Sequence, residues 1–397
     1  MSIFSLVLSL LFLFGDPPAY YDVSFEEQTI DDQVSIGYGL AIGDVDGDGK
    51  PDILLADKNQ FVWYRNGDWK RFVMVENLTA HDNVCIAVRD IDGDGMVEVA
   101  VGAQWNPSET NDPSLSGSVH YLVRPEDPTQ PWTPIALHHE PTVHRMRWAK
   151  AGDDAYHLIV VPLHGRGNID GRGKGAKVLA YEMVDDNPYG RWRHRTVDES
   201  MHRTHNLDVF EEDGGETIYI SGEEGVKAFT YRRGSWRSRS SDWLVRDQPM
   251  SEVRHGHIRS RGAKVIAGIE PLHGNMVTLY KPPLGDSLFV PGLTERMVLE
   301  KNMVEGHGLV VADFLGLGRD QVVAGWRTPN AYGVVGIKMY IPFNQYWEAW
   351  DMFWIDIDGM ACQDLVAADL DGDGKLDLIA AGRGTHNLKI YWNRSGE

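Results

Sequence analysis

The sequence predicts an all-β protein, a seven-bladed β-propeller closed by N- and C-terminal strands in the last blade. Three observations support this prediction. A strand with an aromatic residue near its end recurs roughly every fifty to sixty residues. Each copy is accompanied by other short strands and tight Gly/Asp turns, and no helical period interrupts them. The last unit lacks one strand, and a segment that could replace it stands near the N-terminus.

The aromatic strand marks one unit of the repeat. Its copies read FVWYRN, SVHYLV, KVLAYE, KAFTYR, MVTLYK, IKMYIP and LKIYWN, with tyrosines at Tyr64, Tyr121, Tyr181, Tyr231, Tyr280, Tyr340 and Tyr391. An alternating strand, a turn and an apolar strand precede each copy, and a Trp-led segment such as WKRFVMVE usually follows it. Four short antiparallel strands of this kind are typical of one propeller blade.

The seventh unit stops after LKIYWNRSGE and so has no fourth strand. The segment YDVSFEEQTID, residues 21–31, precedes the first complete unit and resembles an outer strand. Pairing this segment with the seventh unit closes the ring and removes the exposed sheet edges that would otherwise favour aggregation. We therefore expect one propeller domain over residues 17–397.

The N-terminus and the composition restrict where the protein works and what it binds. Residues 1–14, MSIFSLVLSLLFLF, are apolar but too few to span a bilayer, which predicts a signal peptide over residues 1–16 and a secreted or periplasmic protein. With 38 Lys plus Arg against 58 Asp plus Glu, the net charge is −20, which disfavours nucleic acid and anionic membranes. A carbohydrate partner and a monomer or small homo-oligomer are expected. Cys85 and Cys362 fall in predicted strands of separate units, so we expect two free buried thiols.

Three units carry an acidic turn between their first and second strands. The turns read DVDGDGKPD, DIDGDGMVE and DLDGDGKLD, with carboxylates at loop positions 1, 3, 5 and 9. These residues are Asp44, Asp46, Asp48 and Asp52; Asp90, Asp92, Asp94 and Glu98; and Asp369, Asp371, Asp373 and Asp377. Oxygen ligands at this spacing favour Ca²⁺, with Mg²⁺ as the alternative, and we expect the ion to be structural.

The acidic turns resemble the FG-GAP/VCBS repeat of integrin-type propellers. An EF-hand is disfavoured because an apolar strand follows each loop directly, where an EF-hand has a helix. In the sixth unit the turn reads DFLGLGRD from Asp313, with leucines at positions 3 and 5, and this copy is expected to bind no cation.

Histidines gather at the start of the innermost strand in four consecutive units. The residue six positions before the acidic turn is Tyr38, Val84 and Gln363 in units one, two and seven, and His307 in unit six. Matching VHRMRWA, THNLDVF and VRHGHIR to the same strand adds His144, His205 and His255. Three neutral imidazoles around an open position are a common zinc arrangement, so these four residues are candidate ligands of a Zn²⁺-like transition metal in the channel mouth.

The ends of the second strands meet the same face and carry further polar residues. They are His164 and Arg166 in unit three, Glu223 and Glu224 in unit four, Glu270 and His273 in unit five, and Trp326 and Arg327 in unit six. The acidic turns belong to the opposite face. We therefore expect any chemistry to lie at the histidine face, separate from the structural cations.

At these residues the sequence resembles the propeller domain of the aldos-2-ulose dehydratase family, also described as 1,5-anhydro-fructose dehydratases. The resemblance implies a carbon–oxygen lyase that eliminates water from a keto-sugar, with a metal in the propeller mouth besides structural cations. Fungal members carry further cupin-type domains, and we expect none in this sequence, so the resemblance does not assign it the substrates of those members.

The chemistry assigns a role to each candidate. Elimination next to a ketone needs a Lewis acid, a base for the α-proton and an acid for the departing hydroxyl. We expect His144, His205 and His255 or His307 to hold the metal, His164 or His273 to be the base, and Glu270 or Glu223 to assist the leaving group. Arg166, Arg327 and Trp326 would orient the sugar.

Two other functions fit the same sequence. A polysaccharide lyase or glycosidase could use Arg166 or Arg327 to neutralise a uronate carboxylate. A non-catalytic, calcium-stabilised binding propeller is the third reading, although it leaves the four histidines without a reason. Fold alone does not decide between them.

Overall fold

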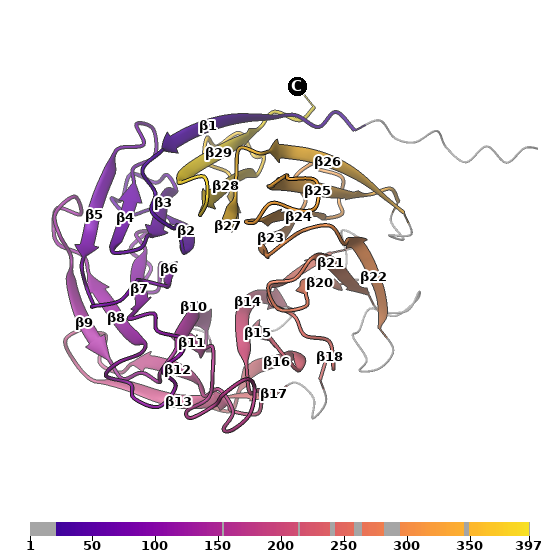
Figure 1. Ribbon diagram of the computed structural model, residues 1–397. Helices are drawn as coiled ribbons and strands as arrows, with labels where there is room; N and C mark the ends of the chain where they lie inside the picture. Colours follow the sequence, from indigo (N-terminus) through magenta and orange to yellow (C-terminus); the bar gives the residue numbers. More distant parts are fainter. Residues whose placement is uncertain are drawn as a thin grey trace, which may run out of the picture.

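The computed structural model describes residues 21–152, 155–212, 215–238, 243–257, 264–281, 294–344 and 349–396. The described residues contain strands and turns only, arranged as seven antiparallel sheets around a common axis (Figure 1). This confirms the predicted all-β, seven-bladed propeller. In this described part, no helix of a length and hydrophobicity suited to crossing a membrane is found. The predicted signal peptide, residues 1–16, lies outside the described residues.

In blades one to six, four strands follow one another in sequence order from the axis outward. Blades one to three are β2 (Gly39–Gly43), β3 (Asp52–Ala56), β4 (Gln60–Tyr64) and β5 (Arg71–Glu76); β6 (Cys85–Arg89), β7 (Glu98–Ala103), β8 (Ser118–Val123) and β9 (Thr133–Leu137); and β10 (Val143–Lys150), β11 (Tyr156–Pro162), β12 (Val178–Met183) and β13 (Trp192–Asp198). Blades four and five are β14 (Thr204–Glu212), β15 (Gly215–Gly222), β16 (Gly225–Arg232) and β17 (Ser235–Ser238), with the short β18 (Val245–Arg246) also pairing β16; and β19 (Val253–His257), β20 (Lys264–Glu270), β21 (Met276–Lys281) and β22 (Glu295–Glu300). Blade six is β23 (Gly306–Ala312), β24 (Gln321–Trp326), β25 (Gly336–Pro342) and β26 (Trp350–Ile357).

The seventh blade joins the two ends of the chain. It consists of β27 (Cys362–Ala368), β28 (Asp377–Gly382), β29 (Asn387–Asn393) and the N-terminal β1 (Phe25–Asp31). Strand β1 pairs antiparallel with β29 and lies along the outside of the ring (Figure 1). The predicted closure by N- and C-terminal strands is therefore confirmed.

The recurring tyrosines connect neighbouring blades. The hydroxyl of Tyr64 on β4 donates to Asp31 on β1 at 2.5 Å. In the same way Tyr391 on β29 donates to Asp356 on β26 at 2.7 Å, and Tyr340 on β25 donates to a fourth-strand glutamate of blade five at 3.2 Å. In these three cases the third strand of one blade bonds to a carboxylate on the outer strand of the blade before it. This hydrogen bond explains why these units have a tyrosine near the end of the third strand.

Small residues allow the inner strands to pack closely around the axis. Cys85 and Cys362 are both buried and free, as predicted. A side-chain carbon added at Gly308 would come within 2.6 Å of the Cys362 sulfur, so glycine permits β23 to approach β27. Because the inner strands pack closely, the polar groups near the axis reach the surface at the ends of these strands.

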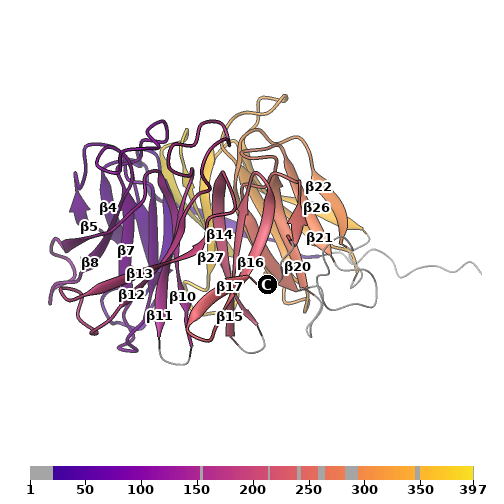
Figure 2. The same ribbon diagram turned by 90° about the horizontal axis from the view of Figure 1, so that it is seen from below.

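The two faces of the disc carry different chemistry. Seen from the side, the sheets stand next to one another around the ring (Figure 2). The acidic turns follow the ends of β2, β6 and β27, whereas His144, His205 and His307 lie at the starts of β10, β14 and β23. Because these are opposite ends of equivalent strands, the histidines and the acidic turns occupy opposite faces.

Candidate functional site

Three histidines from blades four, five and six meet at the centre of the histidine face. His205 lies on β14, His307 lies on β23, and His273 follows the end of β20. One ring nitrogen from each lies within 4.8 Å of the others. The Nε2 atoms of His205 and His273 are 2.7 Å apart, and the rings of His273 and His307 stack at 5.2 Å. His205 and His307 are buried while His273 is exposed, so the cluster reaches the surface at His273.

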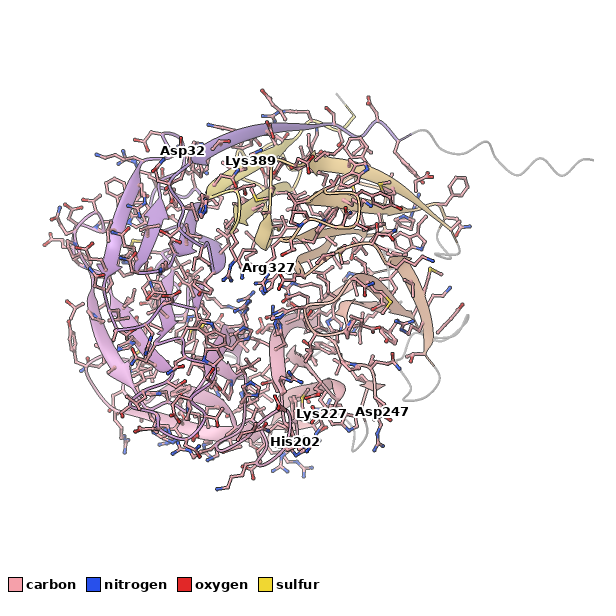
Figure 3. All side chains as sticks on the ribbon, in the orientation of Figure 1. Asp32, His202, Lys227, Asp247, Arg327 and Lys389 are labelled. Atoms are coloured by element: carbon pink, nitrogen blue, oxygen red, sulfur yellow. The ribbon has the colours of Figure 1, made fainter. Side chains whose placement is uncertain are left out.

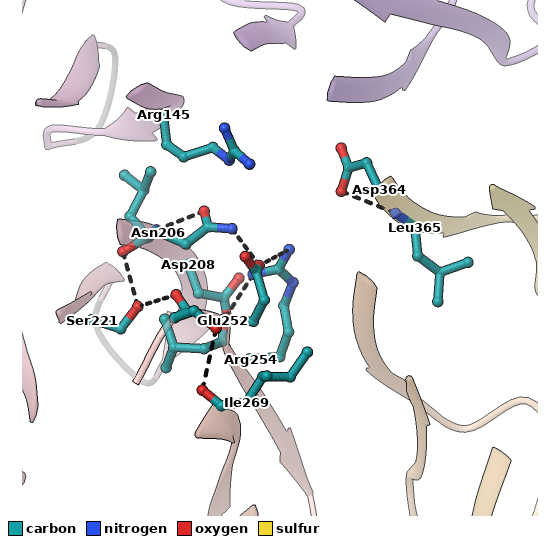
Figure 4. A network of polar contacts seen from close by, with 12 residues as sticks. Arg145, Asn206, Asp208, Ser221, Glu252, Arg254, Ile269, Asp364 and Leu365 are labelled. Atoms are coloured by element: carbon teal, nitrogen blue, oxygen red, sulfur yellow. Dashed lines mark hydrogen bonds and ion pairs between the residues drawn. The ribbon is translucent and has the colours of Figure 1, made fainter. Parts of the chain in front are cut away.

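Buried acceptors orient the His205 ring. Its Nδ1 lies 3.2 Å from the carbonyl oxygen of Ser251 and 3.4 Å from the carboxylate of Glu252. Both groups only accept hydrogen bonds, so Nδ1 carries the proton and Nε2 keeps its lone pair. Glu252 is 1 % exposed and is held in turn by the side chains of Asn206 and Arg254 (Figure 4). A carboxylate behind a histidine is the usual outer support of a metal ligand.

The imidazoles of the cluster are uncharged at neutral pH. Burial lowers the pKa of His205, and it lowers that of His307 well below the ordinary value. Loss of water around the ring, followed by the repulsion that a protonated His205 would add, lowers the pKa of His273 to about 3. Neutral imidazoles offer lone pairs, which is the state required of ligands for zinc and similar ions.

Of the four histidines that the sequence placed together, the structure keeps His205 and His307 in one cluster. His144 lies beside the cluster: its Nδ1 donates to the carbonyl oxygen of His205 at 2.7 Å, and the two rings lie 4.7 Å apart. His255 lies elsewhere, with its Nδ1 3.2 Å from Asp208 and its ring 3.4 Å from that of Tyr219. At the start of the inner strand of blade five, the side chain that contacts His205 is Glu252, 3.4 Å from its Nδ1. The prediction that His255 belongs to this group is therefore wrong. The position equivalent to His205 is occupied in blade five by Glu252, three residues before His255 and directly before β19.

Three predicted polar residues at the second-strand ends form ion pairs. Arg166 holds Glu140 through two nitrogens at 3.1 and 2.9 Å. Glu223 receives two hydrogen bonds from Arg203, at 3.1 and 3.0 Å. Glu270, 2 % exposed, lies 2.5 Å from the Arg296 guanidinium and accepts from the Tyr280 hydroxyl. The carboxylates of Glu223 and Glu270 are thus already neutralised by arginines.

Trp326 belongs to the core. Its side chain is 1 % exposed, and its indole N–H donates to the carbonyl oxygen of Val334 at 2.9 Å. Trp354 and Lys338 cover the ring, at 5.6 Å each. The structure therefore places this indole inside the blade and leaves it little surface for contact with a sugar.

Arg327 and His164 remain on the histidine face. Arg327 bonds to Gln363 at 3.0 Å and to Glu305 at 3.2 Å, and it lies near the centre of the ring (Figure 3). Its charge contributes to the lowered pKa of His307 and His273, after burial. His164 follows Leu163, whose carbonyl oxygen accepts from the backbone of Thr204 next to His205. Its Nδ1 is buried and has no hydrogen-bond partner among the described residues.

The acidic turns form compact oxygen clusters. Carboxylate oxygens of Asp44, Asp46 and Asp48 lie within 4.8 Å of one another, as do those of Asp90, Asp92 and Asp94, and those of Asp369, Asp371 and Asp377. The carboxylate at position 9 fixes the loop to its blade: Asp52 accepts from the backbone N–H groups of Val45 and Asn66, both at 2.8 Å. Burial raises the pKa of Asp52 to about 7. Calcium binding at these turns stays a prediction.

Two family models match parts of the chain. The aldos-2-ulose dehydratase β-propeller domain matches residues 116–282, and the FG-GAP-like repeat matches residues 38–101. Both resemblances expected from the sequence are thereby confirmed. Aldos-2-ulose dehydratase of Phanerodontia chrysosporium is 23% identical over 333 residues, which cover 77% of this chain. The chain spans 36% of the length of that relative.

Solved structures share the fold. BBS1N in complex with ARL6DN matches with a TM-score of 0.56 and 14% identity, covering 92% of this chain and 95% of that one. The extracellular domain of the hybrid two-component system BT4673 from B. thetaiotaomicron matches with a TM-score of 0.53 and 10% identity, covering 93% and 39%. At these identities the likeness supports the propeller architecture alone.

Proposed function

We propose that this propeller, which matches the aldos-2-ulose dehydratase β-propeller over residues 116–282, is a metal-assisted carbon–oxygen lyase that eliminates water from a keto-sugar. The observation that supports this most is the cluster of His205, His273 and His307 at the centre of one face, with three uncharged ring nitrogens within 4.8 Å. A zinc-like ion held by these nitrogens would supply Lewis-acid stabilisation of the enediolate that forms when the α-proton leaves.

The residues around the cluster give the elimination its other parts. Glu252 fixes the tautomer of His205 and so keeps its Nε2 lone pair directed at the cluster. We assign the removal of the α-proton to His164. Its Nδ1 has no hydrogen-bond partner among the described residues, and the backbone of the preceding Leu163 bonds to that of Thr204. Arg327 faces the same centre and orients the sugar. Glu270 and Glu223 pair with arginines and so are held as carboxylates, which leaves the protonated His164 to return its proton to the departing hydroxyl.

A direct assay tests the proposal. The protein, supplied with Zn²⁺, is incubated with 1,5-anhydro-fructose or an aldos-2-ulose, and the ultraviolet absorbance of the conjugated enone product is followed. We expect His205→Ala and His307→Ala to abolish turnover, whereas His194→Ala, on the exposed outer strand β13, retains it. His164→Ala should abolish turnover while leaving bound metal unchanged. Wild-type protein that binds no transition metal and forms no enone would be a binding propeller instead.

A further inference from the structure

A second feature of the ring centre is a buried arginine. Arg145 is 7 % exposed. Its Nη1 donates to the carbonyl oxygens of His144 at 2.9 Å and Val84 at 3.5 Å. In Figure 4 its guanidinium points toward the middle of the ring, between Asn206 and Asp364, and is joined to neither. The side chain therefore directs a positive charge at the same centre as the three histidines, because His144 packs against His205.

Two carboxylates, Asp364 and Glu252, interact with this charge only at longer range. Among the described residues no carboxylate lies within 4.0 Å of the Arg145 nitrogens, whereas the equally buried Lys338 and Lys389 contact acids at 2.6 and 3.2 Å. The acids near the centre are bound elsewhere. Asp364 accepts from the backbone of Leu40 and Leu365, at 2.7 and 2.9 Å, and Glu252 faces His205. A buried cation that no carboxylate contacts directly is costly, and a chain of net charge −20 has many acids that could have paired with it.

The guanidinium edge that binds carboxylates is not used by the protein. Elsewhere in this chain that edge, formed by Nε and Nη2, holds an acid: Arg203 binds Glu223 with it at 3.1 and 3.0 Å. In Arg145 neither Nε nor Nη2 has a hydrogen-bond acceptor among the described residues. This planar fork matches the two oxygens of a carboxylate better than it matches a hydroxyl.

We propose that the ligand of this site carries a carboxylate, and that Arg145 binds it while the rest of the molecule faces the three histidines. This inference rests on the proposed function and narrows the substrate from keto-sugars in general to keto-sugars that also carry a carboxylate. The elimination stays balanced: the base takes the α-proton, the electrons of that carbon–hydrogen bond form the new carbon–carbon double bond as the carbon–oxygen bond on the neighbouring carbon breaks, and the protonated base gives its proton to the departing hydroxyl, which leaves as water. No oxidant or reductant is required.

Binding of simple probes tests the inference. D-Glucuronate, D-gluconate and neutral D-glucose are titrated calorimetrically into wild-type protein, Arg145→Met and the control Arg193→Met. The control loses the same charge on outer strand β13, where Arg193 pairs with Glu182. We expect the wild type and the control to bind a carboxylate probe more tightly than glucose, and Arg145→Met to bind that probe about ten-fold or more weakly. Glucose binding should be equal in all three.

Further variants separate this inference from the metal hypothesis. Arg145→Lys keeps the charge without the fork and should bind the probe with intermediate affinity, which also covers the case in which Arg145→Met does not fold. Carboxylate binding that depends on Arg145 and persists in His307→Ala supports the inference even if no metal-dependent turnover is found. Equal affinity for glucuronate, gluconate and glucose, or equal carboxylate affinity in wild type and Arg145→Lys, overturns it.

Discussion

The Nε2 atoms of His205 and His273 lie 2.7 Å apart, although the residues belong to different blades. Because the Nδ1 of His205 faces a carbonyl oxygen and the Glu252 carboxylate, its Nε2 presents a lone pair to His273. His307 brings a third ring nitrogen to the same place. Ring nitrogens from three blades thus meet at one place. The Glu252 carboxylate, which contacts His205 but is not itself in the cluster, can be tested separately from the three histidines.

Glu252→Gln should weaken zinc binding about ten- to a hundred-fold, because the amide keeps the size of the side chain but removes the charge behind His205. Competition with a chromophoric chelator measures the affinity. Glu223→Gln is the matched control, since Glu223 lies on the same face but pairs with Arg203. Unchanged affinity in Glu252→Gln, with the thermal unfolding of both variants near that of wild type, would contradict the orienting role.

The acidic turns allow a comparison within one molecule. Asp46→Asn should reduce bound calcium by one ion per chain and lower the melting temperature in calcium buffer, because Asp46 contributes an oxygen to the first cluster. Asp313→Asn, in blade six, should leave the calcium content unchanged. Asp313 caps its turn through the backbone N–H groups of Leu317 and Gly318, at 2.8 and 2.6 Å, but leucines replace the neighbouring carboxylates. Calcium content by mass spectrometry after desalting decides the outcome.

The fold and the turns were predictable because their signals are local. A tyrosine near the end of the third strand, Gly/Asp turns and the missing outer strand each depend on a few adjacent residues. The site depends on register between blades. A buried methionine precedes the inner strand in blades four and five, but Met201 lies four residues before His205 and Met250 only two before Glu252. Counting along the sequence therefore selected His255 and missed Glu252.

The roles of the second-strand acids were also beyond the sequence. Glu270 is neutralised by Arg296 and Glu223 by Arg203, and both arginines lie some twenty or more residues away on the chain. His273, in the turn after β20, has a left-handed backbone with φ of 48°, a conformation that no spacing pattern reveals. The sequence predicted the face on which the polar groups gather. Which of them remain available was decided by pairing in three dimensions.

The contact between blades six and seven should carry measurable stability. Asp356, 5 % exposed, accepts from the Tyr391 hydroxyl at 2.7 Å and lies 3.2 Å from the Lys389 ammonium group. Asp356→Ala leaves both groups buried without this partner and should lower the free energy of unfolding by about 2–4 kcal/mol. Glu27→Ala removes the exposed second partner of Lys389 and should cost less than about 1 kcal/mol. Denaturant unfolding compares the two variants. Equal losses of unfolding free energy would show that burial does not determine how much the Asp356 contacts stabilise the protein.

The stability of the ring should decrease in mild acid, and His120 on β8 should account for part of that decrease. Burial, followed by the nearby His139, lowers the pKa of His120 to about 4, against about 6.5 in an unfolded chain. Between these values the unfolded chain binds a proton that the folded chain does not, so the free energy of unfolding falls as the pH falls from about 6.5 to about 4. His120→Gln removes this titration, and the loss of stability across that interval should become smaller by on the order of 2 kcal/mol. Urea unfolding at a series of pH values measures the slope, with His81→Gln, an exposed histidine before β6, as the control. A slope that is the same in wild type and His120→Gln would mean that folding does not lower the pKa of His120.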